Sequence, residues 1–207
     1  MGLDRYRYFL ISVLCVLGCK GGEEEGVESP FQELIDNGAG KYLGQVSPSQ
    51  VSEEGNTRQY DFDIADGPVC LRGGSYTMAT RSGSSESLLI YLQGGGACWS
   101  SLCLAFEDSH RGVPDFGMLN PTLAANPFKD WNVGYLPYCD GSLFVGDVDI
   151  DDDQDGSVDR YHRGLVNLTA SLEVIHSDFP DPPEIMITGL SAGAYGAPLA
   201  GMLVRTV

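Results

Sequence analysis

The spacing of apolar residues divides the chain into segments with different predicted secondary structures. Residues 87–92 (SLLIYL) and 184–189 (EIMITG) are short, continuous apolar runs, which is typical of strands buried on both faces. Residues 59–64 (QYDFDI) alternate between polar and apolar side chains, and residues 131–138 (WNVGYLPY) form a further apolar run. These four segments are therefore predicted to be strands.

Two later segments have the character of helices. Within residues 161–179 four apolar residues recur at steps of three and four, as on one face of a helix: Leu165, Leu168, Leu172 and Ile175. Residues 192–204 (AGAYGAPLAGMLV) are rich in small and apolar residues and are separated from the last predicted strand by two residues. Strands that alternate with helices predict an α/β fold with a parallel or mostly parallel sheet and flanking helices.

The first residues have the pattern of an export signal rather than of a folded domain. Arg5 and Arg7 precede a short apolar run, FLISVLCVLG, which is too short for a permanent membrane span. The residues VLGC resemble a bacterial lipobox, so residues 1–18 are predicted to be a lipoprotein signal peptide and Cys19 the lipidated residue. A plain secretory signal cut nearby is the alternative. Residues 19–58 are predicted to be an acidic, glycine-rich tether followed by a surface lead-in.

Net charge and cysteine content limit which partners and which cellular compartment are expected. The net charge of −17 disfavours nucleic acid as a partner, and we interpret it as the solvated surface of an exported protein. Once the signal and Cys19 are set aside, an even set of cysteines remains: Cys70, Cys98, Cys103 and Cys139. Three pairings are possible in an oxidising compartment, and the short CWSSLC segment favours 98–103 together with 70–139.

The strongest candidate for chemistry is the turn GLSAG, which follows the predicted strand 184–189. A serine between glycines, after an apolar strand and before a helix, has the pattern of a nucleophile elbow, with Ser191 as the nucleophile. The small neighbours allow strand and helix to approach closely at a strained turn. The alternative is a glycine-rich strand-to-helix turn without catalytic function.

A second candidate is the triple glycine that follows the predicted strand 87–92. Glycines there can point backbone amides toward an oxyanion, as the loop after an earlier strand does in esterases of this architecture. We therefore predict an oxyanion hole formed by the amides of Gly95, Gly96 and Ala192. A phosphate-binding loop is disfavoured, because the lysine and hydroxyl residues of a P-loop are absent from this segment.

Five motifs occur in an order that resembles the pectin acetylesterase/Notum family: GPVCLRGGSY, LQGGGACWS, WNVGYLPYCDGSLFVGD, YHRG and GLSAGAYG. The resemblance covers about residue 66 to the end of the chain. It implies an α/β-hydrolase-like fold and cofactor-free hydrolysis of carboxylic esters by Ser191, with Asp140 and Ser142 in a segment beside the site. Gln93 and Ala97 depart from residues that are common in this family.

The resemblance favours a deacetylase that acts on acetyl esters of polysaccharide. Two alternatives are a Notum-like carboxylesterase acting on acylated lipid or protein, and a non-catalytic surface lipoprotein that binds polysaccharide. The expected partners are therefore an acylated carbohydrate or another ester substrate and, through Cys19, the membrane of the cell envelope.

An acidic segment, DVDIDDDQDG, raises the question of a metal. Asp151, Asp153 and Asp155 match the start of a calcium-binding loop, but its closing position falls on His162 rather than on glutamate. We favour a solvated loop, and hence no metal, over a calcium site.

The base and acid of a catalytic triad have no evident candidates. In this architecture the triad is ordered Ser, Asp, His, whereas all three histidines, His110, His162 and His176, precede Ser191. No Asp, Glu or His follows Ser191. We therefore expect residues 59–207 to be the N-terminal part of an esterase domain whose C-terminal part is missing, and this chain alone to be inactive.

Overall fold

The computed structural model describes residues 32–100 and 102–205 of the 207-residue chain. The predicted signal peptide and Cys19 lie outside the described residues. Residues 1–33 and 34–207 separate into two units, and the second holds the fold described below. Among the described residues no helix combines the length and apolar character needed to cross a bilayer.

A six-stranded sheet forms the centre of the fold. Its strands lie in the order β1 (Gln50–Glu54), β2 (Thr57–Asp61), β3 (Thr77–Arg81), β7 (Asn132–Leu136), β4 (Leu88–Leu92) and β10 (Ile185–Gly189). The predicted strands 87–92, 131–138 and 184–189 are confirmed as β4, β7 and β10, and the segment 59–64 overlaps β2. The expected burial of 184–189 on both faces is wrong, because β10 is an edge strand whose Ile185 and Met186 are 42% and 41% exposed. The sheet starts earlier than predicted, because β1 lies in the segment assigned to the surface lead-in.

The α/β class is confirmed, but the sheet is mixed rather than mostly parallel. Strand β4 runs parallel to both β7 and β10, whereas β1, β2, β3 and β7 pair antiparallel in succession. The difference follows from connection length. Only residues 55–56 join β1 to β2, and such a short connection reverses the chain. Parallel strands need a long crossover: residues 93–131 connect β4 to β7, and the connection from β7 to β10 contains α2 (Gly164–Asp178).

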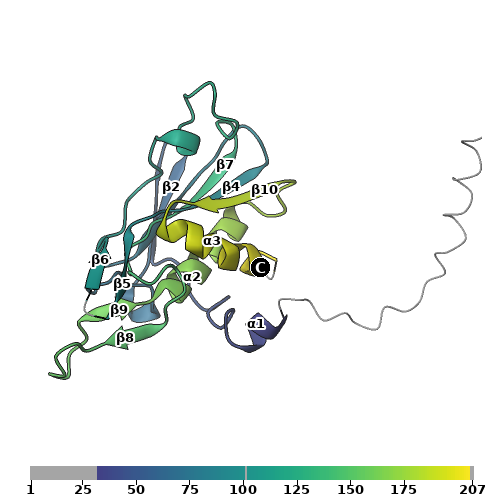
Figure 1. Cartoon of the computed structure of the whole chain (residues 1–207). Coiled ribbons are helices and arrows are strands. Elements are labelled where there is room, and N and C mark those ends of the chain that lie inside the picture. Colours follow the sequence, from purple (N-terminus) through teal and green to yellow (C-terminus); the bar gives the residue numbers. More distant parts are fainter. Residues whose placement is uncertain (1–31, 101, 206–207) are drawn as a thin grey trace, which may run out of the picture. The chain divides into compact units, whose positions relative to one another are not determined.

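The two faces of the sheet are covered by different structures. Leu88, Ile90 and Leu92 of β4 join a core cluster with α2 and α3 (Ala192–Leu203), which lie together against the sheet (Figure 1). Leu89 and Tyr91 point to the opposite face, where irregular chain between β6 and β7 packs on them. The continuous apolar run thus reflects burial on both faces, but helices flank only one of them.

The two predicted helices are confirmed as α2 and α3, and the apolar residues that predicted α2 are buried. Leu165, Leu168, Leu172 and Ile175 of α2 all face the core. Close contact explains one glycine of β7, because a Cβ at Gly134 would lie 2.3 Å from Ile175 Cδ1. The remaining helical elements are short: α1 (Gln32–Asp36) and the 3-10 turns η1 (Ile64–Asp66) and η2 (Gly117–Leu119).

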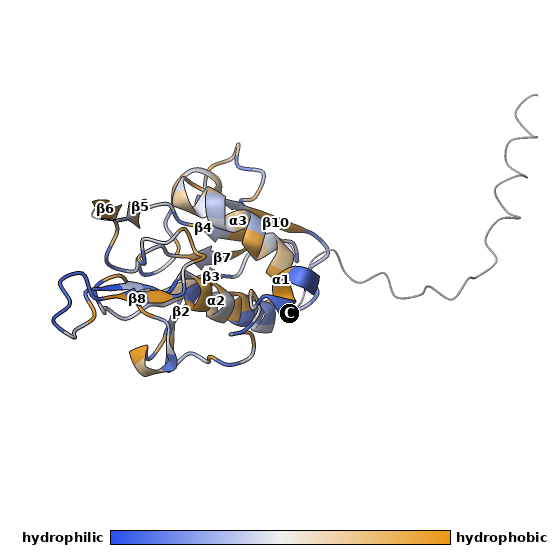
Figure 2. Cartoon of the chain, turned by 60° about the horizontal axis from the view of Figure 1, so that its bottom comes forward, coloured by the Kyte–Doolittle hydropathy of each residue, from blue (hydrophilic) through white to orange (hydrophobic). Residues whose placement is uncertain are grey.

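Two small hairpins lie outside the main sheet. One pairs β5 (Gly96–Trp99) with β6 (Leu102–Ala105), and the other pairs β8 (Val148–Ile150) with β9 (Arg160–His162). The turn between β8 and β9 is strongly hydrophilic (Figure 2). The sequence pattern did not predict either hairpin, and His162 belongs to β9 rather than to the start of the helix.

Both predicted disulfides are present. Cys70 is bonded to Cys139 across 69 residues, and Cys98 to Cys103 across five. The first bond is buried in the core, whereas the second joins opposite positions of β5 and β6. The first therefore crosslinks distant parts of the chain, and the second stabilises one local hairpin.

Candidate active site

The carboxyl ends of the parallel strands β7, β4 and β10 carry the segments singled out in the sequence. The glycine loop follows β4, residues 137–142 follow β7, and Ser191 lies two residues after β10. Ligands of open α/β sheets bind at this end, because loops from neighbouring parallel strands meet there. The tertiary structure thus brings three separate sequence motifs together at the carboxyl ends of three neighbouring strands.

Ser191 occupies a strained turn between β10 and α3. Its φ of 51° and ψ of −114° are unusual for a residue with a side chain, and its side chain is exposed. The neighbouring glycines are required by close backbone contact. A Cβ at Gly193 would lie 2.0 Å from Leu92 O, and one at Gly189 would lie 2.4 Å from the carbonyl carbon of Gly193. Strand and helix can approach so closely only without these side chains.

The glycine loop lies directly against this turn. A Cβ at Gly94 would lie 2.3 Å from Leu190 O and 3.1 Å from Ser191 Cβ. Gly96 has a φ of 86° and would clash with Leu104 O if it carried a side chain. Ala192 begins α3, so its amide has no partner within the helix. Gly94, which the sequence analysis did not single out, is the residue that joins the two motifs.

Asp140 and Ser142 form a buried polar turn after β7. The Asp140 carboxylate accepts hydrogen bonds from the Ser142 amide, at 3.1 Å, and from the Ser142 hydroxyl. Burial raises the pKa of Asp140 to about 6. His162 Nδ1 lies 2.7 Å from the carbonyl oxygen of Asp140 and therefore donates its proton to it. Among the described residues, no hydrogen bond joins Asp140 or Ser142 to Ser191.

None of the three histidines is placed as a base for Ser191. His162 is buried and bonded to Asp140, and His110 meets the ring of Tyr135 edge-on. His176 lies in the last turn of α2 and lines a cavity of about 240 Å³ near the amino ends of β4 and β10. Ser191 lies at the opposite ends of those strands. In the described part of the chain no histidine hydrogen-bonds to the Ser191 hydroxyl.

A family model described as Pectinacetylesterase matches residues 61–202. The chain belongs to the pectinacetylesterase family. Among curated relatives, pectin acetylesterase 4 of Arabidopsis thaliana is 33% identical over 141 residues, covering 61% of this chain and 34% of the relative. Pectin acetylesterase 11 of the same plant is 29% identical over 148 residues, covering 65% and 37%. The chain thus spans about a third of the length of these relatives.

A solved structure supports the fold. The Wnt deacylase Notum from Drosophila superposes with a TM-score of 0.53 at 21% sequence identity, over 62% of this chain and 41% of Notum. At this identity the similarity concerns the fold alone. The chain therefore has an α/β-hydrolase type of fold, and its sheet is mixed.

The acidic segment of this pectinacetylesterase family member forms the turn between β8 and β9. Carboxylate oxygens of Asp151, Asp153 and Asp159 lie within 4.8 Å of one another. Asp155, part of the calcium candidate, is not in this group; its carboxylate accepts the Ser157 amide at 2.8 Å. The Asp151 carboxylate already accepts backbone amides of the same turn. The predicted closing position, His162, is bonded elsewhere, so the loop differs from a complete calcium loop.

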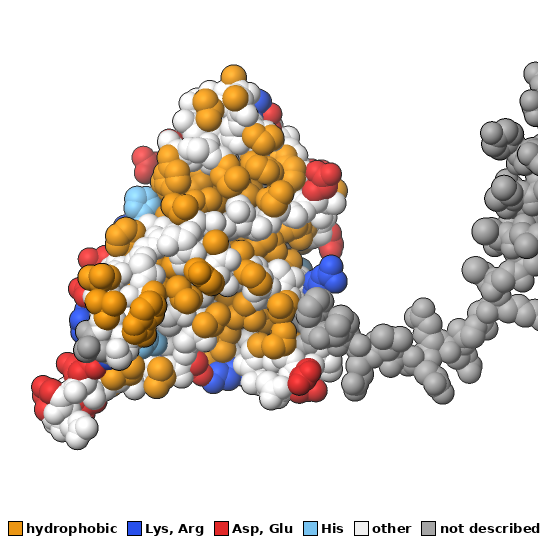
Figure 3. Space-filling model, in the orientation of Figure 1, with side chains coloured by type: hydrophobic (Ala, Val, Ile, Leu, Met, Phe, Trp, Pro, Cys, Tyr) orange, Lys and Arg blue, Asp and Glu red, His pale blue; other side chains and the backbone are white. Residues whose placement is uncertain are grey.

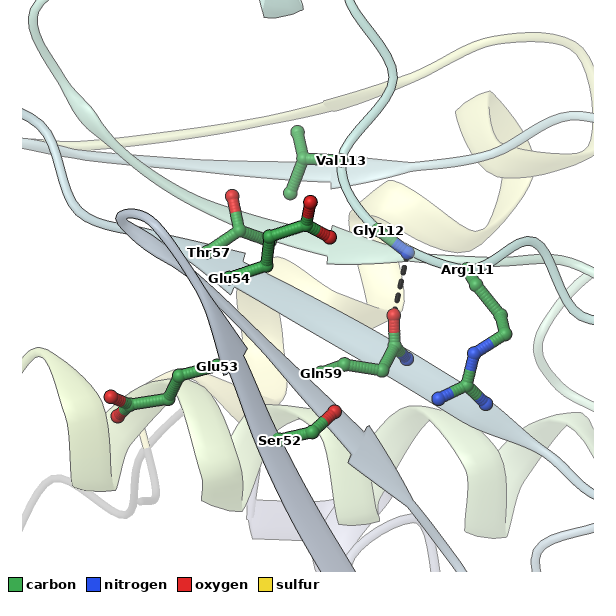
Figure 4. Close-up of a pocket in the computed structure, with 8 residues that line it drawn as sticks. All are labelled: Ser52, Glu53, Glu54, Thr57, Gln59, Arg111, Gly112 and Val113. Carbon is green, nitrogen blue, oxygen red and sulfur yellow. Dashed lines mark hydrogen bonds between the residues drawn. The ribbon is translucent and has the colours of Figure 1, made fainter.

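A cavity of about 590 Å³ lies away from Ser191, beside the β1–β2 hairpin. Figure 4 shows its lining, with Gln59 Oε1 accepting the Gly112 amide at 2.5 Å. Strands β1 and β10 form opposite edges of the sheet, so this cavity and the Ser191 turn lie on different parts of the fold. It therefore does not belong to the candidate active site.

Proposed function

We propose that the full-length protein is a serine carboxylic ester hydrolase that removes acetyl groups from carbohydrate, with Ser191 as the nucleophile. The observation that carries the proposal is the strained Ser191 turn in backbone contact with a glycine loop, at the carboxyl ends of parallel strands. Family membership supports ester hydrolysis, and the description of the family model supports acetyl as the acyl group.

The proposed reaction has two steps. The Ser191 hydroxyl attacks the ester carbonyl carbon while a general base accepts its proton. Amides of Gly95, Gly96 and Ala192 stabilise the negative charge on the carbonyl oxygen, each such donor contributing about 10²–10³ in rate. The bond between the acyl carbon and the sugar oxygen then breaks, the general base returns its proton to that oxygen, and an acetyl-serine remains. Water attacks this ester with the help of the same base, the bond to the Ser191 oxygen breaks, and acetate and the Ser191 hydroxyl are formed.

The residues after β7 would position these groups rather than react. The hydrogen bonds between Asp140 and Ser142 fix the turn that contains Gly141. The carbonyl oxygen of Gly141 accepts the Cys98 amide at 2.9 Å. This bond connects the supporting turn to the strand that follows the glycine loop. Loss of the turn would therefore displace the proposed oxyanion donors without removing any of them.

The proposed location is outside the cytoplasm. Two disulfides are typical of oxidising compartments, and the lipobox-like residues before Cys19 support a lipid anchor at the cell envelope. If Cys19 carries lipid, Cys19→Ser should move the protein from the membrane fraction to the soluble fraction. Unchanged partitioning would contradict lipidation.

The nucleophile can be tested with a fluorophosphonate probe on the full-length protein. Labelling is expected for the wild type and for Ser177→Ala, which removes another exposed serine at the end of α2. Ser191→Ala is expected to abolish both labelling and release of acetate from p-nitrophenyl acetate. Equal labelling of Ser191→Ala would show that a different residue is the nucleophile.

A further inference from the structure

One hydrogen bond fixes the orientation of the peptide between Gly95 and Gly96. The amide of Phe106, the residue that follows β6, donates to the Gly95 carbonyl oxygen at 2.8 Å. The peptide is trans, so its carbonyl oxygen and its N–H point in opposite directions. Because the oxygen points toward Phe106, the N–H of Gly96 points away from β6. The Gly96 amide therefore takes no part in the pairing of β5 with β6.

The backbone on either side of this peptide has no side chain to resist its rotation. Gly96 has a φ of 86°, in the left-handed region, and glycine adopts negative φ values about as readily. A flip of the peptide would exchange the Gly96 N–H for the Gly95 carbonyl oxygen on the side away from β6. An oxyanion on that side would then meet a negative partial charge instead of a donor. The bond from Phe106 thus decides which of the two groups faces the substrate.

The same peptide lies close to the candidate nucleophile. A Cβ at Gly95 would lie 2.7 Å from ring carbons of both Phe106 and Tyr138, so both rings pack on this glycine. One residue earlier, a Cβ at Gly94 would lie 3.1 Å from Ser191 Cβ. The orientation of this peptide therefore matters where the ester carbonyl would be bound.

The register of the β5–β6 hairpin decides whether Phe106 reaches Gly95. The two strands form a sheet of their own, and a two-stranded hairpin is only marginally stable in water. A slip by one position would move Phe106 away from Gly95. Cys98 and Cys103 are direct partners in the pairing and are joined by a disulfide, which excludes such a slip.

The disulfide also lies on the side of the hairpin that packs on the protein. A Cβ at Gly141 would lie 2.7 Å from Cys98 Sγ, and the Cys98 amide donates to the Gly141 carbonyl oxygen. Faces alternate along a strand, so the large apolar residues of the hairpin lie on its other, outward face, where Figure 3 shows hydrophobic side chains: Trp99, Leu102 and Leu104. The crosslink thus lies between the turn after β7 and the glycine loop.

Resting on the proposed function, we propose that the Cys98–Cys103 disulfide is a positioning crosslink for the oxyanion hole. It keeps Phe106 opposite Gly95, and it thereby keeps the Gly96 amide directed at the ester oxygen, although it contacts no reacting atom itself. Without it the register loosens, the peptide between the glycines populates both orientations, and fewer molecules have a complete oxyanion hole. Because an oxyanion exists only after attack by Ser191, kcat falls and KM does not change.

The test measures hydrolysis of p-nitrophenyl acetate by the full-length protein with and without Cys98→Ser/Cys103→Ser. Rates are divided by the amount of Ser191 that a fluorophosphonate labels at completion, which removes the contribution of unfolded protein. We expect kcat per labelled site to fall about tenfold to a hundredfold and KM to stay within about twofold. Leu104→Ala, which removes an exposed side chain from the same hairpin and keeps the disulfide, is the matched control and should change neither.

A trifluoromethyl ketone gives a second readout of the oxyanion hole. The Ser191 oxygen bonds to its carbonyl carbon, the serine proton passes to the general base, and the ketone oxygen becomes an oxyanion. The inhibition constant of the double variant should rise by the factor by which kcat falls. The pH midpoint of kcat should stay where it is in the wild type, because the general base is not displaced.

A second variant removes the hydrogen bond itself. Phe106→Pro has no N–H to donate to Gly95, whereas Phe106→Leu keeps the N–H and changes only the ring. Phe106→Pro should lower kcat per labelled site more than Phe106→Leu does. Combined with Cys98→Ser/Cys103→Ser it should cause no further loss, because both changes act through the same peptide.

An unchanged kcat per labelled site in the double cysteine variant would overturn this proposal, as would losses that multiply when the variants are combined. A raised KM or a moved pH midpoint would also overturn it, because the effect would then lie in substrate binding or in the base. None of these results bears on Ser191 as nucleophile, which Ser191→Ala tests separately. If the wild type is neither labelled nor active, the proposed function fails and this inference fails with it.

Discussion

The two small hairpins outside the sheet show opposite solutions to the same problem. Neither has enough strand pairing to be stable alone. The β5–β6 hairpin is closed by a disulfide and exposes apolar side chains, whereas the β8–β9 hairpin has no disulfide and exposes carboxylates. Its turn is held by the Asp151 carboxylate, which accepts the amides of Gln154 and Gly156 at 2.7 and 2.9 Å. In this protein the hairpin with an exposed apolar face is crosslinked by a disulfide, whereas the hairpin with a solvated turn is held by hydrogen bonds.

Both hairpins rest on the same turn after β7. The carbonyl of Asp140 accepts His162 Nδ1 from β9, and the carbonyl of Gly141 accepts the Cys98 amide from β5. Arg160 of β9 also donates to the carbonyl of Ser100, between β5 and β6, at 3.2 Å. The position of each hairpin therefore depends on this buried turn more than on its own strands.

Removing the Cys70–Cys139 bond should have the largest effect, because it loosens the support of both hairpins. The bond closes a loop of 69 residues, for which chain entropy gives a loss of about 4 kcal/mol in the free energy of unfolding. Urea unfolding of the double variant Cys70→Ser/Cys139→Ser measures it. A loss no larger than that of the Cys98–Cys103 variant would contradict this ranking.

Asp140→Asn should have the next largest effect, and the effect should depend on pH. Burial raises the pKa of Asp140 from 3.8 to about 6, so the folded protein binds a proton more tightly than the unfolded chain. Relative to Asp140→Asn, the wild type should lose up to roughly 3 kcal/mol of stability as pH rises from about 4 to above about 6. Urea unfolding near both limits measures it. A constant difference between wild type and Asp140→Asn at the two limits would contradict the raised pKa.

Removing the Cys98–Cys103 bond should have a smaller and local effect. The loop spans five residues, so chain entropy gives about 2 kcal/mol. Trp99 lies on the hairpin, so in a Trp131→Phe background its fluorescence anisotropy reports the mobility of β5–β6 alone. We expect anisotropy to fall in Cys98→Ser/Cys103→Ser while hydrogen exchange of β8–β9 is unchanged. Equal loosening of both hairpins would show that they are coupled rather than independently closed.

Calcium should have the smallest effect, because the acidic turn is already held by its own backbone amides. The melting temperature is expected to change by less than about one degree at millimolar calcium. A rise of several degrees in the wild type that is absent from Asp151→Asn would identify the turn as a cation site. The β8–β9 hairpin would then be closed by a metal ion, and it would no longer differ from the disulfide-closed β5–β6 hairpin in lacking a crosslink.

Much of the central fold was predictable because its signals are local. The continuous apolar run of β4 reflects burial of consecutive residues, and the three-and-four spacing in α2 reflects burial of one helix face, both of which a short segment records by itself. The apolar run of β10 predicted a strand but not its exposure, which follows from its place at the edge of the sheet. The GLSAG motif was likewise recognisable, since close approach of strand and helix excludes side chains at Gly189 and Gly193. The two disulfides followed from an even cysteine count and one short spacing.

The tertiary structure alone decided how these pieces meet. The pairing of β3 with β7 and the packing of Gly94 against Leu190 depend on contacts between residues far apart in the chain. The hairpins β5–β6 and β8–β9 pair residues close in the chain, but their positions depend on bonds to the turn after β7. The outward apolar face of β5–β6 is the clearest case. Its alternation of large and small residues is that of a half-buried strand, and only the position of Gly141 beneath the disulfide determines which half is buried. Periodicity specifies that a strand has two different faces, but the free energy of burial depends on what lies against each face.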